Sequence, residues 1–233
     1  MDILNNIVLI LQRYWDLFLE GIGVTLLLSA IAVGCGVIIG SLLALMRLSK
    51  WHIGKVRPLN LIATIYVEII RGTPLLLQLY FFFFLLPMMI PALETSASFS
   101  ITLALCLNSG AYVAEVIRAG ISAVDKGQTE AARSLGLSAG RTTVKIVLPQ
   151  AFKIAIPPMV NQFIITLKDT SILTIIGLAE IVNKATQYVS VRYDYFATYV
   201  WVGIFYLVFT SLLMILAHYM EKRLSYDRKG SRS

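Results

Sequence analysis

Five apolar stretches, each long enough to cross a bilayer, constrain this chain more than any other feature. About 20 helical residues cross the roughly 30 Å of hydrocarbon in a bilayer. The stretches are residues 24–46, 59–92, 99–117, 151–178 and 195–217. Inside lipid every backbone N–H and C=O needs a partner within the protein, which favours helices for runs of this length. The sequence therefore predicts an all-α membrane protein, one domain over residues 1–233, with about five transmembrane helices.

The composition agrees with a membrane solvent. A soluble domain carries about 25% charged residues, whereas this chain has 14% charged and 58% hydrophobic residues. In a soluble protein a net charge of +7 would suggest nucleic acid, but here the placement of the charges matters more. We therefore expect a lipid bilayer, and no nucleic acid, as a partner.

The N-terminal segment, residues 1–20, predicts a helix lying along the membrane surface. Apolar residues recur at helical spacing opposite polar ones, as Ile3, Ile7 and Leu11 do opposite Asn5 and Gln12. The segment has no basic n-region, and the apolar run after it is too long for a signal peptide. We therefore expect an uncleaved first span at residues 24–46.

The basic residues predict the orientation, because cytoplasmic loops retain Lys and Arg. With five spans, fifteen of the twenty basic residues fall on one side, in the first loop, the third loop and the C-terminal tail. The opposite side keeps Arg13, Lys184 and Arg192. The N-terminus is therefore expected outside and the C-terminus in the cytoplasm.

Two features of the first two spans bear on their shape. The stretch 59–92 is too long for one straight span, and the Arg71–Pro74 segment, "RGTP", interrupts it. Because proline removes a backbone donor and restricts the residue before it, we expect a bend or break there. In the first span, Gly34, Gly36 and Gly40 would allow close contact between helices.

The stretch "EAARSLGLSAGRTTVKIVLP", residues 130–149, is a polar helix–turn–helix between apolar spans. Asp125 is expected to cap a first helix, and Gly136 to supply a left-handed residue after it. Ser138 is expected to cap a second helix that ends near Pro149. On these residues alone, a solvated loop whose charges only set the topology remains an equal alternative.

This stretch resembles the EAA loop of permease subunits of bacterial ABC importers. The matching residues, with the family's spacing, are Glu130, Ala131, Ala132, Gly136, Ile146, Leu148 and Pro149. Residues 67–78, 111–121, 126–136 and 167–173 are similar to characteristic blocks of the polar amino acid branch, although Ala119 stands where a second glycine is common. The resemblance covers nearly the whole chain from about residue 15.

The resemblance implies a role and a set of partners. The polar loop would be a cytoplasmic coupling element, residues 125–149, that docks in a groove on a separate ATPase subunit. Two permease subunits (identical or paralogous), two ATPases and an extracytoplasmic amino acid binding protein would assemble in the bacterial plasma (inner) membrane. The sequence has no G-x-x-x-x-G-K-[ST] loop, so we expect ATP and Mg²⁺ on the partner and no cofactor or enzymatic site in this chain.

Ionisable and amide side chains inside the spans are the candidates for substrate binding, because such groups are costly in lipid and usually face a cavity, partner or pathway. Three polar stripes are expected at similar depth near the membrane midplane, where transporters place their sites. The candidates are Glu68, Arg71, Thr73, Asn108, Asn161, Gln162 and Asp169.

The same residues allow a purely structural interpretation. Glu68 with Arg71, and Lys168 with Asp169, would neutralise each other, and the amides would hydrogen-bond between helices. We expect Glu115 and Arg118, which lie closer to the cytoplasm, to have a structural or gating role.

Two other classes of function are alternatives for a chain with these features. An ion-coupled secondary amino acid transporter or channel would use the same intramembrane charges, but such proteins usually show an internal repeat and none is visible. A membrane-embedded enzyme is disfavoured because no catalytic motif is found. The two cysteines and two histidines show no ligand spacing, so no metal site is expected. The favoured function is an importer permease for a polar or charged amino acid, working by alternating access.

Overall fold

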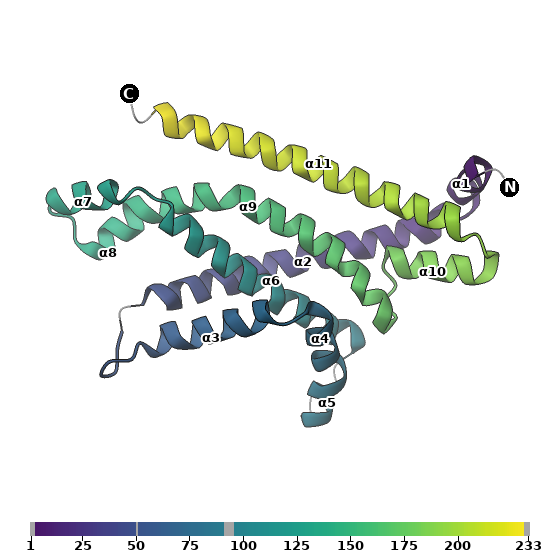
Figure 1. Ribbon diagram of the computed structural model, residues 1–233, viewed down its shortest axis with the longest axis horizontal. Coiled ribbons are helices and arrows are strands. Elements are labelled where there is room, and N and C mark those ends of the chain that lie inside the picture. The colour runs from purple at the N-terminus through teal and green to yellow at the C-terminus, as the bar shows by residue number, and fades with distance from the viewer. Residues whose placement is uncertain (1–2, 50, 91–95, 231–233) are drawn as a thin grey trace.

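The computed structural model describes residues 3–49, 51–90 and 96–230. Within these residues the chain is helical, and its single β-type contact is an isolated bridge between Ile53 and Val56. The bundle is long and narrow, with the N-terminus near one end and the C-terminus toward the other (Figure 1). In the described part of the chain, four helices are long and apolar enough to cross a membrane, or five if one bent pair counts as a span.

The first two helices meet at a turn at Tyr14. Helix α1 covers Ile3–Arg13, and α2 runs over Trp15–Leu48 as one continuous helix. Residues 15–20 therefore belong to the long helix α2, whereas the sequence pattern had assigned them to the N-terminal helix. Buried Ile10 and Phe18 pack with residues of α10 (Ile181–Arg192) and α11 (Tyr195–Gly230) at this end of the bundle.

The second apolar stretch is broken where the sequence predicts it. Helix α3, Pro58–Gly72, is followed by α4, Leu75–Tyr80, then by a π-helical turn, Phe81–Leu85, and by α5, Leu86–Met89. The two halves are bent by 107° relative to each other, so that α4 and α5 project sideways from the bundle (Figure 1). Thr73 is extended at φ −117° and ψ 145°, as a residue before proline prefers.

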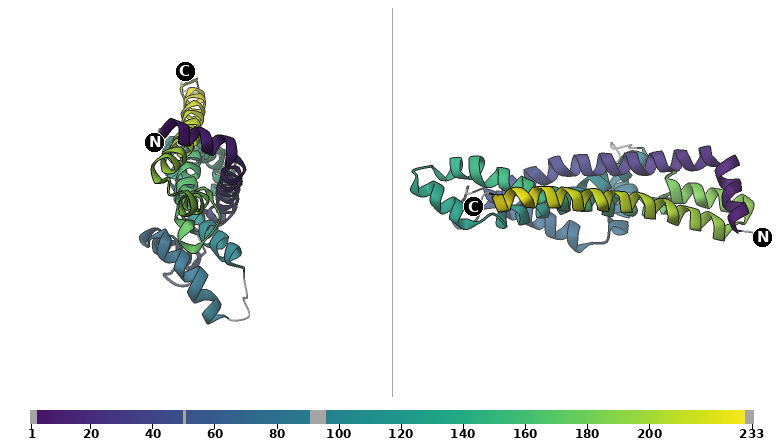
Figure 2. Two further views of the ribbon diagram at one scale, coloured as in Figure 1. Left: turned by 90° about the vertical axis from the view of Figure 1, so that its right-hand side faces the viewer. Right: turned by 90° about the horizontal axis from the view of Figure 1, so that it is seen from above.

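The rest of the chain supplies three more long helices and the shorter helices between them. Helix α6, Ala97–Ser122, leads into α7, Lys126–Ser134, and α8, Ala139–Thr142, from which a π-helical turn, Thr143–Val147, runs into α9, Leu148–Asp169. A 3₁₀ segment, Thr170–Ile176, precedes α10 and α11. Two views show α7 and α8 at the end of the bundle opposite to α1 and α10 (Figures 1 and 2).

Among the described residues, helices α2 and α6 form the most extensive pairing in the bundle, with close approach at two glycines. A Cβ atom built on Gly36 would lie 2.4 Å from Ser109 Oγ, and one built on Gly40 would lie 2.7 Å from the Ala114 nitrogen. Gly34, by contrast, has no neighbouring atom within 4 Å. Two of the three glycines noted in the sequence therefore permit close helix contact, and the third faces open space.

Candidate functional site

The bend between α3 and α4 is held by one buried amide. Gln78 Nε2 donates to the Ile70 carbonyl at 2.7 Å and to the Thr73 carbonyl and hydroxyl oxygens at 3.1 and 2.9 Å. Gln78 Oε1 accepts from Asn108 Nδ2 on α6 at 2.9 Å. These bonds satisfy a carbonyl freed by the bend, and they bring two of the candidate substrate residues, Thr73 and Asn108, to one point.

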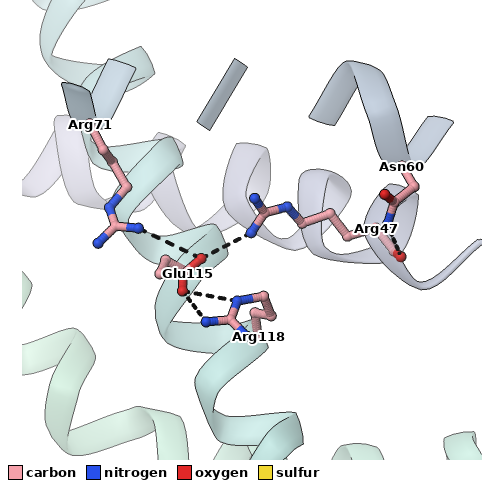
Figure 3. Close-up of polar contacts among 5 residues, drawn as sticks. All are labelled: Arg47, Asn60, Arg71, Glu115 and Arg118. Carbon is pink, nitrogen blue, oxygen red and sulfur yellow. Dashed lines mark hydrogen bonds and ion pairs between the residues drawn. The ribbon is translucent and has the colours of Figure 1, made fainter. Parts of the chain in front are cut away.

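A second polar group, which we call the Glu115 cluster, joins α2, α3 and α6 (Figure 3). One carboxylate oxygen of Glu115 accepts from Arg47 at 2.9 Å and lies 3.7 Å from Arg71 Nη1. The other accepts from Arg118 Nε at 2.9 Å. Arg71 also lies over the ring of Tyr112, 5.5 Å from its centre. One carboxylate thus serves three guanidinium groups from three helices.

The cluster is tied to the start of α3 as well. Asn60 Nδ2 donates to the Arg47 carbonyl at 2.7 Å (Figure 3). Only 11% of the Arg47 side chain is exposed, against 51% for Arg118. Arg47 is therefore the partner most dependent on Glu115, because a buried charge without a counter-charge is costly.

A cavity of about 420 Å³ lies beside this cluster, between the basic-loop ends of α2, α3 and α6. Its charged lining residues are Arg47, Glu68, Glu115 and Arg118. Glu68 forms no ion pair within the described residues, so the expected pairing of Glu68 with Arg71 along α3 is replaced by the pairing of Arg71 with Glu115 across helices.

The candidates on α9 lie apart from these groups. Gln162 is buried, and its Nε2 is 3.4 Å from the Thr166 hydroxyl on the same helix, while Asn161 is exposed. Asp169, at the end of α9, is half-buried. None of the three shares a hydrogen bond or ion pair with Glu68, Arg71, Thr73 or Asn108 within the described part of the chain.

The polar helix–turn–helix is built from local capping contacts. Asp125 Oδ1 accepts from the Gly127 N–H at 2.8 Å, and Ser138 accepts from the Arg141 N–H at 3.4 Å. Gly136 has φ +82°, and the N–H groups of Gly136 and Leu137 bond to the carbonyls of Arg133 and Ala132. These two hydrogen bonds together form a Schellman motif, which ends α7 and reverses the chain direction.

The expected end of the second helix near Pro149 is wrong. The helix continues from α8 through the π-helical turn into α9, over Ala139–Ile176. Pro149 lies inside this continuous helix, directly after the π-helical turn, and has no N–H of its own to donate. The π-helical turn just before it shifts the hydrogen-bond register, with Leu148 N–H bonding to the Thr143 carbonyl.

Comparison with known proteins identifies the family. Residues 36–226 match the family described as "Binding-protein-dependent transport system inner membrane component". The chain belongs to this family. It is therefore an inner-membrane permease of an ABC transporter, a transporter type in which ATP hydrolysis lies in separate subunits.

Two curated relatives are similar in sequence to this permease over almost their whole length. The permease is 38% identical to the arginine transport system permease protein ArtQ of Bacillus subtilis, over 88% of this chain and 91% of that protein. It is 40% identical to the probable glutamine ABC transporter permease protein GlnM of the same organism, over 92% and 96%.

Solved structures show the same fold. An amino acid ABC transporter crystallised with histidines matches at a TM-score of 0.85 and 39% identity, over 96% of the permease and 99% of that chain. An inward-facing MetNI methionine ABC transporter matches at 0.76 with 15% identity, over 91% and 98%, and supports the fold alone. The all-helical membrane fold expected from the sequence is thereby confirmed.

Sequence reasoning missed two residues that organise the site. Gln78 was overlooked although it is a polar residue in the apolar run 75–90, which is itself a signal. The sequence around Arg47 indicates only a charge that sets the topology, because its partner Glu115 lies 68 positions away. Among the described residues, no group of three or more His, Cys, Asp or Glu side chains is arranged to hold a metal ion.

Proposed function

We propose that the permease is the membrane-spanning subunit of an ATP-driven importer for a polar or charged amino acid. The observation that carries the proposal is the α7–α8 elbow, which stands at the extreme end of the bundle (Figure 1). Its surface is available for a partner, because most residues from Asp125 to Arg141 are exposed. The amino acid permeases among the relatives support the class of substrate.

The elbow is the proposed coupling element, with the cytoplasm on its side of the membrane. Glu130, Ala131, Ala132, Gly136, Ile146, Leu148 and Pro149 form its motif. Ala132 is buried under the turn, whereas Glu130 is exposed on α7. Exposed Glu130 would contact an ATPase subunit, and Gly136 would set the angle between the two short helices.

The proposed orientation follows from the charge distribution along the bundle. The α2–α3 loop, the elbow and the end of α11 carry most of the basic residues, and they lie together toward one end (Figures 1 and 2). The N-terminus, α1 and α10 lie toward the other end. By the positive-inside rule the first end faces the cytoplasm and the second faces an extracytoplasmic binding protein.

Transport would proceed by alternating access in a dimer of permeases, identical or paralogous. Exposed Glu68 and Arg71 on α3 are charged at membrane depth, and such groups face a pathway or partner rather than lipid. Glu68, Arg71, Thr73, Asn108, Asn161, Gln162 and Asp169 are the proposed substrate-binding residues of that pathway. ATP binding by two partner subunits would move the elbow and, through the continuous α8–α9 helix, the walls of the pathway.

The test is coupling in proteoliposomes that contain the permease, its ATPase and its binding protein. We expect Glu130→Lys to leave the protein in the membrane but to reduce amino acid uptake per ATP hydrolysed at least about tenfold, a loss of roughly 1.4 kcal/mol of coupling. Gly136→Pro should do the same, because proline cannot adopt φ +82°. Lys55→Glu, at an exposed residue of the α2–α3 loop outside the coupling element, is the control for charge reversal and should keep wild-type coupling. Wild-type coupling in both motif variants would overturn the docking role.

A further inference from the structure

The cavity beside the Glu115 cluster separates positive from negative charge. On one wall, Glu115 is shared by Arg47, Arg71 and Arg118, which leaves a surplus of positive charge. On the α3 wall, Glu68 has no cationic partner among the described residues. A ligand that carries both signs on neighbouring atoms would therefore find complementary charges on the two walls.

The cavity is also unsuited to lipid. Four ionised side chains line it, and ionised groups at this depth face water, a pathway or each other because their desolvation is costly. Its volume of about 420 Å³ lies within the roughly 300–1,000 Å³ typical of small-molecule sites. Asn60 and Ser122, near the helix ends on the basic-loop side, also line it, so the cavity reaches from Glu68 toward the proposed cytoplasmic end.

We propose that this cavity is an exit-side binding site for the zwitterionic part of an amino acid. Arg118 and Arg47 would receive the α-carboxylate, and Glu68 the α-ammonium group. This inference rests on the proposed function, since it assumes that amino acids pass from the middle of the bundle toward the basic-loop end.

The remaining lining residues indicate which part of an amino acid the cavity recognises. Besides the four charged residues, the cavity is bordered by small polar and aliphatic side chains such as Thr64, Ala44 and Ile121. Within the described residues, the charged lining consists of Arg47, Glu68, Glu115 and Arg118, which suit the ammonium and carboxylate groups of an amino acid. The site therefore recognises the groups that all amino acids share and leaves side-chain selectivity to other residues.

The direct test is protection of an engineered thiol. Ser122 is exposed and lines the cavity, so Ser122→Cys should react with a water-soluble maleimide in the purified permease–ATPase complex in nanodiscs. We expect glycine, at about ten times its dissociation constant, to slow this reaction about tenfold by mass action. The unmodified protein, with Cys35 and Cys106 inside its helices, sets the background rate.

Two analogues of glycine separate the two charges. Glycinamide lacks the carboxylate and N-acetylglycine lacks the ammonium group, so each should protect at least about tenfold less well than glycine, a difference of roughly 1.4 kcal/mol. Equal protection by all three compounds would mean that the cavity does not recognise a zwitterion. Absence of protection by glycine would overturn the site altogether.

A matched pair of substitutions tests whether glycine protects the thiol by binding in the cavity. In the Ser122→Cys background, Thr64→Leu fills the cavity and should abolish protection by glycine. Thr102→Leu makes the same change on α6 outside the cavity lining and should leave protection intact. Loss of protection in both variants, or in neither, contradicts the proposal.

The same protein, reconstituted with its ATPase and binding protein in proteoliposomes for an uptake measurement, distinguishes failure of this site from failure of the proposed function. If ATP-driven amino acid uptake is measured but glycine gives no protection, only the exit-side site is wrong. If the complex transports no amino acid and glycine gives no protection, both the proposed function and the proposed exit-side site are wrong.

Discussion

At the scale of single residues, the most deeply buried acidic side chain among the described residues lies outside the spans. Glu180, between the 3₁₀ segment and α10, is fully buried and accepts the N–H groups of Val182 and Asn183 at 3.0 and 2.7 Å. Burial raises the pKa of this carboxyl, and the two N–H groups, with the Thr174 and Tyr206 hydroxyls, only partly offset that effect. Glu180 therefore fixes the start of α10 at an electrostatic cost.

This raised pKa gives the permease a pH-dependent stability. A folded-state pKa above the unfolded value means that the folded protein binds the proton more tightly. The contribution to stability is fully present below the ordinary pKa of about 4.3 and is lost as pH rises through the folded value. Thermal unfolding of the wild type in detergent should therefore show a decrease in stability from acid to neutral pH. Glu180→Gln should show a smaller decrease, because glutamine does not titrate.

A control separates charge from capping at the same position. Glu180→Ala removes both acceptors and should destabilise the protein by about 1 kcal/mol at all pH values in that range. If wild type and Glu180→Gln show the same pH dependence, the titration belongs to another group.

The Glu115 cluster leads to a second prediction at this scale. Glu115→Gln removes the counter-charge of three guanidinium groups, and we expect a loss of about 2 kcal/mol of unfolding free energy, mainly because buried Arg47 is left unpaired. Arg118→Gln should cost less than about 1 kcal/mol, because that side chain is half exposed and screened by solvent. Thermal unfolding of the three proteins checks the order, and equal losses would contradict it.

At the scale of elements, the bend between α3 and α4 depends on a side chain beyond the break. Pro74 prevents a continuous helix, but the proline alone leaves the direction of α4 open. Gln78 bonds to Ile70 and Thr73 before the break and to Asn108 on α6. The direction of the broken helix is thus fixed by three partners of one amide.

We expect Gln78→Leu to destabilise the permease by roughly 2 kcal/mol, because it leaves the Ile70 carbonyl and the Asn108 amide without their buried partner. Thr73→Val removes only one of these bonds and should cost about 1 kcal/mol or less. The measurement is the unfolding free energy in detergent micelles. If the larger loss occurs in Thr73→Val, Gln78 is not the residue that holds the bend.

At the scale of the whole molecule, the distance between α2 and α6 sets the frame on which the site is built. These helices carry Arg47, Asn108 and Glu115, and they approach closely because Gly36 and Gly40 lack side chains. In a membrane, such packing of small residues is a main source of helix association.

Gly40→Ala should therefore destabilise the fold by about 1–3 kcal/mol, because the new methyl group would meet Val113 and the backbone of Ala114. Gly34→Ala on the same helix meets no atom and should be neutral or stabilising by up to about 1 kcal/mol, since alanine is the better helix former. Thermal unfolding of the two variants gives the comparison. Equal changes in stability for the two variants would contradict a close α2–α6 contact at Gly40.

The sequence by itself determined the features that depend on neighbouring residues. The apolar stretches, the break at Thr73 and Pro74, the caps at Asp125 and Ser138, and the left-handed Gly136 all follow from backbone hydrogen bonding and allowed φ values within a few positions. The continuation through Pro149 escaped prediction because the register shift that accommodates it lies in an unmarked π-helical turn.

The tertiary structure alone decided which distant side chains meet. The sequence placed Arg71 three residues from Glu68, yet Arg71 pairs with Glu115, 44 positions away, because packing of α3 on α6 brings those two groups together. Which glycine of α2 makes contact, and which partner Gln78 finds on α6, depend likewise on the rotation of whole helices against one another. That rotation is set by the sum of many packing contacts, which no short stretch of sequence contains.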